Sequence, residues 1–296
     1  MKRLLTLAMT VAMLLVVATP ASAKKYGETL RILAIGNSFS DDGMEHLPAL
    51  LKDLGVKDVE LARLYVGGCT LERHMQFYNK EEAAYLFYHS AAGQNEWVKA
   101  EEKYSIQQAL AMGEWDIITM QQASGVSGLY ESYVPNLEQL IAAVRKAQPQ
   151  AELVWHMTWA YSTDSNHKEY PNYDRDQLKM YRAITECVHN LLGDYKSIKT
   201  IIPSGTAIQS LRESAINNSP KDFTRDGYHM DFGAGRYALA CTWYEKLIRP
   251  YTHRSMMGNT LRLDLGEVKV TDQTAPYLQK AARQAVKRPF KVRAVK

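Results

Sequence analysis

The stretch LAIGNSFSDDG, residues 33–43, joins an apolar run to a cluster of small polar residues. The apolar run is typical of a buried strand, and Gly36 ends it abruptly. Ser38 then stands directly after the predicted strand end. Two interpretations are open. Either Ser40 or Asp41 caps the following helix and Ser38 lies in the turn, or the strand end presents Ser38 as a nucleophile.

The rest of the chain alternates strand-like and helix-like segments. Short, nearly continuous apolar strands separated by helices are typical of a parallel sheet that is covered on both faces. The segment 77–102, rich in Tyr and Glu, is interpreted as an insertion beside the site. The predicted strands are Leu30–Ile35, Val59–Val66, Ile117–Met120, Leu153–Met157 and Ile198–Ile202, and the predicted helices are Met44–Leu54, Ser105–Met112, Asn136–Ala147, Asp176–Leu192 and Ala207–Glu213.

The first residues have the plan of a signal peptide. Lys2 and Arg3 precede an apolar stretch, and Ala21-Ser22-Ala23 suits cleavage after residue 23. The apolar stretch is shorter than the ~20 residues that a membrane span needs. We therefore expect export to the periplasm or secretion, with no integral membrane segment after signal removal. Residues 24–296 are predicted to form a single domain, with a core at about 29–250 and a C-terminal extension at 251–296.

Charge and cysteine content exclude several classes of protein. The formal net charge is +4, and much of the positive charge lies in residues 280–296, where aromatic residues are nearly absent. This favours a solvated, partly frayed tail and no nucleic-acid partner. Cys69, Cys187 and Cys241 are too few for a disulfide scaffold, and their odd number leaves at least one thiol without an internal partner. Neither CxxC nor HExxH occurs, so we expect no metal and no cofactor.

A serine nucleophile needs a base, and the base needs a carboxylate that orients it. Among the eight histidines, His229 has the most suitable neighbours, because Asp226 precedes it by three residues in TRDGYHMDFGAG, residues 224–235. Gly227 permits a tight turn that holds the carboxylate against imidazole Nδ1 and leaves Nε2 free to face a serine. Alternatively, Asp226 caps a turn and His229 or Asp231 starts the next helix.

Polar or glycine-rich loops follow several predicted strands. Ser38 follows the first strand, Gly68 the second, and Gln121 and Gln122 the third. Because the carboxyl ends of parallel strands meet at one edge of a sheet, these residues are expected to lie together. His156, on the fourth predicted strand, is either a satisfied core histidine or a wall of the same pocket.

These segments, Gly36-Asn37-Ser38, Gly68, a strand-end amide and Asp226-Gly-Tyr-His229, resemble the four sequence blocks of the SGNH (GDSL-type) hydrolase superfamily. The resemblance runs from Leu30 to about Leu247. It implies a flavodoxin-like three-layer α/β/α sandwich with a central parallel five-stranded sheet. It also implies ester hydrolysis with Ser38 as nucleophile, His229 as general base and acid, and Asp226 as its orienter. The N–H groups of Ser38 and Gly68 would bind the oxyanion.

Two blocks depart from the family's pattern. The first block reads GNS in place of GDS, and the third strand ends in Met-Gln-Gln in place of a segment with asparagine. A glutamine amide must then supply any side-chain donor to the oxyanion, as in sialate-type members that the sequence resembles here. Gln122 is the preferred candidate, and Gln121 stays open because adjacent strand residues face opposite ways.

Aromatic residues near the strand ends indicate the substrate. Tyr65, Trp159 and Tyr161, together with Asn37, are the candidate substrate-binding residues, because aromatic faces stack well on sugar rings. The sequence therefore predicts an exported serine esterase that removes acyl groups, most simply acetyl, from a carbohydrate or another small ester. The choice of a carbohydrate follows the family resemblance. The alternatives are a non-catalytic glycan-binding protein on the same scaffold, and a lipase or thioesterase.

Overall fold

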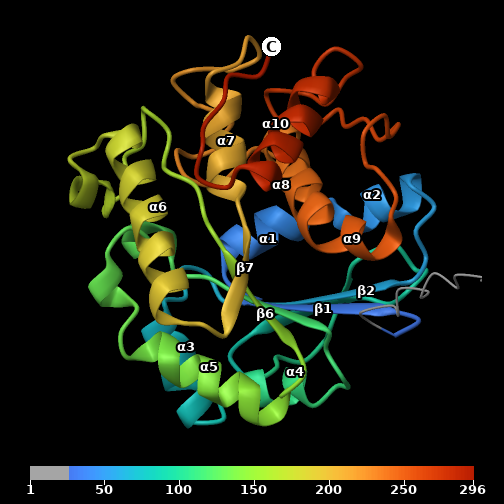
Figure 1. The fold of residues 1–296 in the computed structure, drawn as a ribbon, viewed down its shortest axis with the longest axis vertical. Coiled ribbons are helices and arrows are strands. Elements are labelled where there is room, and N and C mark those ends of the chain that lie inside the picture. The colour runs from blue at the N-terminus through green and yellow to red at the C-terminus, as the bar shows by residue number, and fades with distance from the viewer. Residues whose placement is uncertain (1–26) are drawn as a thin grey trace, which may run out of the picture.

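Seven strands form one mixed sheet in the order β4-β3-β2-β1-β5-β6-β7 (Figure 1). The structure is a computed structural model, and it describes residues 27–296. The predicted signal peptide, residues 1–23, lies outside the described residues. None of the helices within residues 27–296 is long and apolar enough to cross a membrane.

Five of the strands are parallel, and they are the five that the sequence predicts. Each is largely buried, as expected for strands with helices on both faces. Counted alone, they run in the order second, first, third, fourth, fifth, one of the two common orders of doubly wound sheets. The parallel strands are β1 (Leu30–Gly36), β2 (Val59–Tyr65), β5 (Ile117–Met120), β6 (Glu152–His156) and β7 (Ile198–Ile202).

The prediction of a five-stranded sheet is wrong, because two antiparallel strands extend it. They are β3 (Leu86–Ser90), which pairs with β2, and β4 (Val98–Lys99), which pairs with β3. Both lie in the segment that was interpreted as an insertion. Phe87 of β3 is buried while its neighbours Leu86 and Tyr88 are partly exposed, so β3 lacks the continuous apolar run that reveals the parallel strands.

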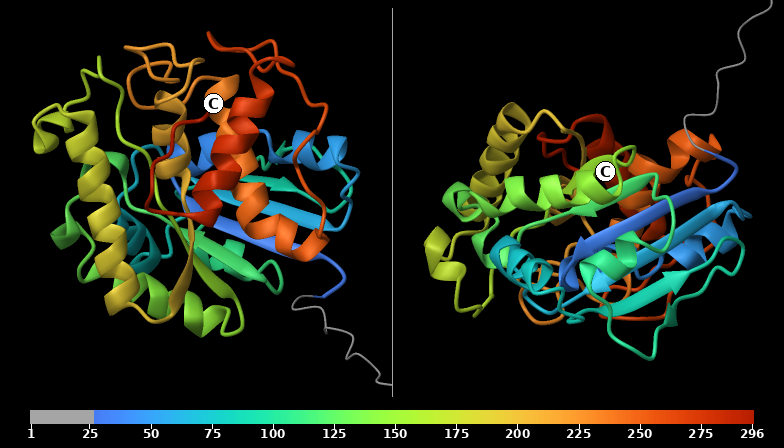
Figure 2. Two further views of the ribbon diagram at one scale, coloured as in Figure 1. Left: turned by 45° about the horizontal axis from the view of Figure 1, so that its top comes forward. Right: turned by 90° about the horizontal axis from the view of Figure 1, so that it is seen from below.

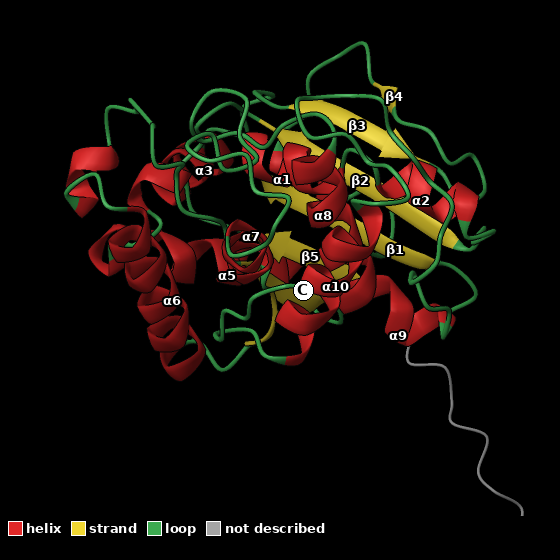
Figure 3. Cartoon of the chain, turned by 90° about the horizontal axis from the view of Figure 1, so that it is seen from above, coloured by secondary structure: helices red, strands yellow, loops and turns green. Residues whose placement is uncertain are grey.

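Helices cover both faces of the sheet, which gives three layers (Figures 1 and 3). The predicted helix at 44–54 is in fact two helices, and the first of them begins earlier, at Ser38. One face carries α1 (Ser38–Met44), α2 (Leu47–Asp53), α7 (Ser204–Arg212), α8 (Ala234–Trp243), α9 (Arg249–Thr252) and α10 (Ala275–Lys287); the other carries α3 (Leu71–Asn79), α4 (Ile106–Leu110) and α5 (Asn136–Ala147), and α6 (Gln177–Asp194) packs beside β7.

The C-terminal residues are part of the packed structure, so the prediction of a frayed tail is wrong. Helix α10 packs on α7 and α8 (Figure 2). Its apolar stripe is buried, and Val295, next to the last residue, is only 2% exposed. The basic residues of this segment had suggested a solvated tail, but they alternate with alanines that recur at helical spacing. The three cysteines are all buried and free.

Candidate active site

Ser38 is the first residue of α1, directly after the end of β1. Asn37 caps this helix, because its Oδ1 accepts the N–H of Phe39 at 3.0 Å. The cap is therefore neither Ser40 nor Asp41, the two residues considered from the sequence. Gly36 is required by close packing, since a Cβ there would lie 2.3 Å from Ser40 Oγ. The turn thus brings Ser38 to the edge of the sheet and leaves it half-buried.

His229 and Asp226 lie in the loop between α7 and α8. Asp226 Oδ1 accepts the N–H groups of His229 at 2.8 Å and of Tyr228 at 3.3 Å, which closes a tight turn around Gly227. Gly227 has φ of +92°, and a Cβ there would lie 3.0 Å from the Cα of Ser165. The turn therefore needs glycine both for its backbone angle and for its contact with the loop after β6.

The tertiary structure joins these two segments in a hydrogen-bonded relay. His229 Nε2 lies 2.8 Å from Ser38 Oγ, and His229 Nδ1 lies 2.7 Å from Asp226 Oδ2. Both contacts are those predicted from the spacing of Asp226 and His229. Burial by itself would raise the pKa of Asp226, but the hydrogen bonds from His229 outweigh it and hold the pKa below its usual value. Asp226 is thus a carboxylate that can orient the imidazole and stabilise its protonated form.

The loop after β2 lies next to Ser38. Gly36 pairs with Tyr65 at the ends of β1 and β2, and Asn37 Nδ2 donates to the carbonyl of Cys69 at 3.0 Å. Gly68 has φ of +59°, and the space around its Cα is open, so its backbone angle alone favours glycine. Within the described chain, the backbone N–H groups of Ser38 and Gly68 have no hydrogen-bond partner.

Gln121 follows β5 and is buried. It lies where the chain leaves the neighbouring strands β1 and β5 toward opposite faces of the sheet. Its Nε2 donates to Asn37 Oδ1 at 2.6 Å, and its Oε1 lies 3.0 Å from His156 Nδ1 and accepts from Ser40 Oγ. His156 is a satisfied core histidine, since its Nε2 also lies 2.9 Å from Ser204 Oγ. Burial lowers the pKa of His156 to about 3, so it stays neutral.

Gln122, the preferred side-chain donor to an oxyanion, is not available for that role in this structure. Its Nε2 donates to the carbonyl of Ser132 at 2.9 Å and to Ser132 Oγ at 3.1 Å, which uses both amide hydrogens. Its Oε1 accepts the N–H of Leu71 at 3.0 Å and of Ala123 at 2.8 Å. The side chain therefore joins the start of α3 to the loop after β5.

Three of the four candidate substrate-binding residues are buried. Trp159 and Tyr161 are both 0% exposed, and Asn37 is 2% exposed with both ends of its amide hydrogen-bonded. Trp159 stacks on Phe39 with ring centroids 4.1 Å apart, so its face packs against the helix of Ser38 instead of a ligand. Tyr65 is partly exposed.

Aromatic residues outside the set predicted from the sequence lie near His229, in the chain or in space. Tyr228 is partly exposed, and its ring lies 4.2 Å from that of His229. His167 packs edge-on against Tyr228 at 4.7 Å. Phe232, three residues beyond His229, is 47% exposed. Tyr228 and Phe232 are close to His229 in the chain, and this signal could have indicated them. His167 is distant in the chain, and only the fold brings it to the site.

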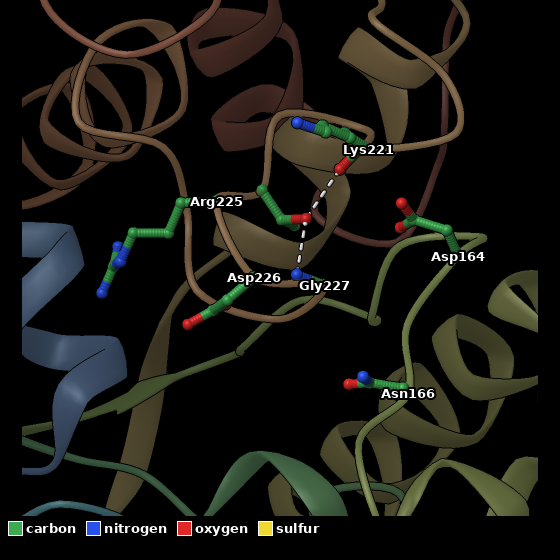
Figure 4. Close-up of a pocket in the computed structure, with 7 residues that line it drawn as sticks. Asp164, Asn166, Lys221, Arg225, Asp226 and Gly227 are labelled. Atoms are coloured by element: carbon green, nitrogen blue, oxygen red, sulfur yellow. Dashed lines mark hydrogen bonds between the residues drawn. The ribbon is translucent and has the colours of Figure 1, made fainter.

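A polar pocket of about 210 Å³ opens beside Asp226 (Figure 4). Asp164 and Asn166 come from the loop after β6 and face the turn that carries Asp226 and Gly227. Within residues 27–296, no group of three His, Cys, Asp or Glu side chains is arranged to hold a metal ion. The remaining lining residues are Lys221, Thr224 and Arg225.

The fold and the site together define a doubly wound α/β protein with a serine–histidine–aspartate relay at the carboxyl edge of its sheet. The chain belongs to the family described as a domain of unknown function, DUF4886, whose model matches residues 31–275. A crystal structure of a DUF4886 family protein from Bacteroides uniformis is similar to it, with 39% identity and a TM-score of 0.80. That similarity covers 90% of this chain and 98% of the other.

More distant similarities involve hydrolases. A protein from Slackia heliotrinireducens, provisionally described as an SGNH hydrolase, shares 22% identity over 74% of this chain and 98% of its own, with a TM-score of 0.46. Axe2, an acetylxylan esterase from Geobacillus stearothermophilus, shares 10% identity over 76% of this chain and 96% of its own, with a TM-score of 0.48. Among curated proteins, none matches the chain at a significant level.

Proposed function

We propose that this protein is a serine hydrolase that cleaves carboxylic esters. The observation that carries the proposal is the relay from Ser38 through His229 to Asp226, with both contacts at hydrogen-bond distance. A serine hydroxyl becomes a useful nucleophile when a base accepts its proton, and the base works best when a carboxylate holds its tautomer.

In the first half of the reaction, His229 Nε2 takes the proton of Ser38, and Ser38 Oγ attacks the ester carbonyl. The carbonyl oxygen becomes an oxyanion, which needs preorganised donors. The N–H groups of Ser38 and Gly68 are the candidates, because they are unpaired within the described chain and the Asn37–Cys69 bond joins their loops. Gln121 supports this arrangement indirectly, through its bond to Asn37.

The tetrahedral intermediate then collapses, and the alcohol leaves with the proton from His229, which completes the first half. In the second half, a water molecule gives a proton to His229 and attacks the acyl-enzyme. The second tetrahedral intermediate collapses, Ser38 Oγ takes the proton back from His229, and the acid is released. Asp226 stays ionised throughout, since hydrogen bonds hold its pKa low. Its charge favours the imidazolium that forms twice in the cycle.

For the substrate, we propose a small acyl group, most simply acetyl, on a carbohydrate alcohol. The pocket beside Asp226 has carboxylate, amide and ammonium groups in its wall, which suit the hydroxyl groups of a sugar better than an alkyl chain. Partly exposed aromatic rings at Tyr228 and Tyr65 offer faces for a sugar ring. Export of the protein, expected from residues 1–23, would bring it to extracellular glycans.

The proposal is tested with a fluorophosphonate probe and an aryl acetate. The wild-type protein should form a covalent adduct at Ser38, located by peptide mass spectrometry, and Ser38→Ala should lower hydrolysis by at least about 10⁴-fold. Ser40→Ala is the comparison for the location of the adduct, because Ser40 lies one half-turn away and bonds Gln121 instead of His229; this variant should still be labelled at Ser38. A wild-type protein without the adduct would instead support a glycan-binding role on the same scaffold.

Chain-length preference tests the proposed acyl group. Comparing aryl acetate with aryl esters of long fatty acids should give the higher kcat/KM for acetate. A preference for the long chains would indicate that the protein is a lipase and not a carbohydrate esterase.

A further inference from the structure

Asp42 lies one helical turn after Ser38 on α1 and is completely buried. Residues four apart in a helix share a face, so Ser38 and Asp42 both face the loop between α7 and α8. A buried carboxylate is costly unless it is paired and fully hydrogen-bonded. The partners of Asp42 therefore indicate why this position holds a charge.

Two partners of Asp42 flank the segment from Asp226 to His229 in the chain. Asp42 Oδ2 accepts the backbone N–H of Met230, the residue after His229, at 2.8 Å. Asp42 Oδ1 lies 3.1 Å from Nη1 of Arg225, the residue before Asp226. The same Arg225 nitrogen also donates to the carbonyl of Met230. One carboxylate on the nucleophile's helix thus holds the residues that immediately flank Asp226 and His229.

A second guanidinium group also pairs with Asp42. Arg236, in α8, donates to Asp42 Oδ1 through Nε at 2.9 Å and Nη2 at 2.7 Å. Asp41 of α1 and Glu45, the residue after this helix, pair with Arg63 of β2 at 3.2 Å and 2.8 Å. The charged residues therefore continue from the loop of Asp226 and His229, through α1, to β2.

Other contacts hold the loop but do not attach it beside the nucleophile. The pairing of Thr224 with Met230, and the bond from Arg225 N–H to the carbonyl of His229 at 3.0 Å, set the shape of the loop itself. His46, which follows α1, bonds the carbonyl of Phe232 at 2.8 Å, beyond the relay. Trp159 Nε1 donates to the carbonyl of Tyr228, the residue before His229, at 2.7 Å, but this bond attaches the loop to the segment after β6. The contacts of Asp42 attach the loop directly to the helix that carries Ser38.

We infer that Asp42 is a positioning residue that holds the loop of Asp226 and His229 against the helix of Ser38, so that His229 Nε2 stays at hydrogen-bond distance from Ser38 Oγ. This inference rests on the proposed function. Its consequence is that a change to the loop side of the cluster slows the chemical step. For an aryl acetate, which has no sugar to occupy the pocket lined by Arg225, substrate binding should be unchanged. Misplacing a reacting group by about 1 Å can cost on the order of 100-fold in rate.

The test compares the two arginines that share Asp42. Asp42→Asn itself would leave two guanidinium groups without their counter-ion and compromise folding. Arg225→Gln and Arg236→Gln each remove one guanidinium from the same carboxylate, but only Arg225 belongs to the catalytic loop. Arg236 is the more buried of the two, with a side chain 11% exposed against 25% for Arg225, so its loss should lower the melting temperature at least as far.

For Arg225→Gln we expect kcat on an aryl acetate to fall by about 10- to 100-fold with KM nearly unchanged. Arg236→Gln should lose much less kcat despite its lower melting temperature. Arg225→Lys should recover part of kcat, because an ammonium group restores a charge opposite Asp42. Equal kcat losses in the two glutamine variants, or losses that follow the melting temperature, would overturn the inference.

The fluorophosphonate probe separates this inference from the proposed function. If the wild-type protein is labelled at Ser38 and the two arginine variants are labelled at equal rates, the positioning role of Asp42 fails and the proposed function stands. If the wild-type protein is not labelled, both fail together.

Discussion

At the scale of single residues, Gln121 and Gln122 are neighbours in the chain, yet the fold gives their amides different partners. Gln121 bonds Asn37, which precedes the nucleophile, whereas Gln122 bonds the first residue of α3 and the loop at Ser132. Successive strand residues point to opposite sides, so the two amides leave the end of β5 in different directions. One glutamine therefore supports the proposed oxyanion site and the other supports the fold.

We predict that Gln121→Ala lowers kcat, because Asn37 loses the amide that holds its side chain and the N–H of Ser38 moves with it. Gln122→Ala should keep a kcat near that of the wild type but lower the free energy of unfolding by about 1–3 kcal/mol, since two buried N–H groups lose their acceptor. Steady-state kinetics and urea unfolding on both variants check this. A larger kcat loss for Gln122→Ala than for Gln121→Ala would contradict this prediction and indicate that the Gln122 amide binds the oxyanion.

At the scale of elements, α8 begins beside a buried carboxylate. Asp231 Oδ1 accepts the N–H groups of Gly233 at 2.9 Å and Gly235 at 3.0 Å, while Oδ2 has no partner within the described chain. Burial raises the pKa of Asp231 to about 7, against the opposing effect of those two hydrogen bonds. The helix that follows the catalytic loop therefore starts at a group that titrates near neutral pH.

This raised pKa predicts how stability depends on pH. Between the ordinary aspartate pKa and about 7, the folded protein keeps a proton that the unfolded chain has released, so Asp231 makes the fold less stable as pH rises. Asp231→Asn removes this titration and keeps the Oδ1 acceptor. Relative to the wild type, the variant should gain in melting temperature between about pH 5 and pH 8. A constant difference across that range would contradict the prediction.

At the scale of the whole molecule, the C-terminal helix completes the helical layer that carries Ser38. Helix α10 packs on α7 and α8, and α8 in turn packs on α1. Leu278, near the start of α10, is 0% exposed. The site and the C-terminal segment therefore belong to one cooperative core, although about forty residues of sequence separate α10 from the catalytic loop.

We predict that Leu278→Ala lowers the free energy of unfolding by about 2–5 kcal/mol, the usual cost of a cavity in a packed core. Leu178→Ala is the matched control, because the same substitution at a leucine that is 45% exposed should change stability by no more than about 0.5 kcal/mol. Urea unfolding of both variants measures the difference. Equal effects would mean that α10 is loosely attached.

Much of the fold and the core of the site could be predicted from local patterns. The five parallel strands are largely apolar, and each is short, so their positions follow from the sequence with small changes at the ends. The contact between Asp226 and His229 follows from a spacing of three residues around a glycine. The antiparallel strand β3 could not be found this way, because Leu86, Tyr88 and His89 are only partly buried and its partner β2 is distant in the chain.

The sequence by itself thus determined the parallel core, the serine at its first strand end and the turn that holds Asp226 against His229, because each depends on residues close together in the chain. Only the tertiary structure decided that Trp159 and Tyr161 are core residues, that Gln122 faces α3 and that Asp42 joins the two halves of the relay. These outcomes depend on which surfaces meet when distant segments pack. A side chain's burial and partners come from the whole fold, whereas a strand or a tight turn is encoded locally.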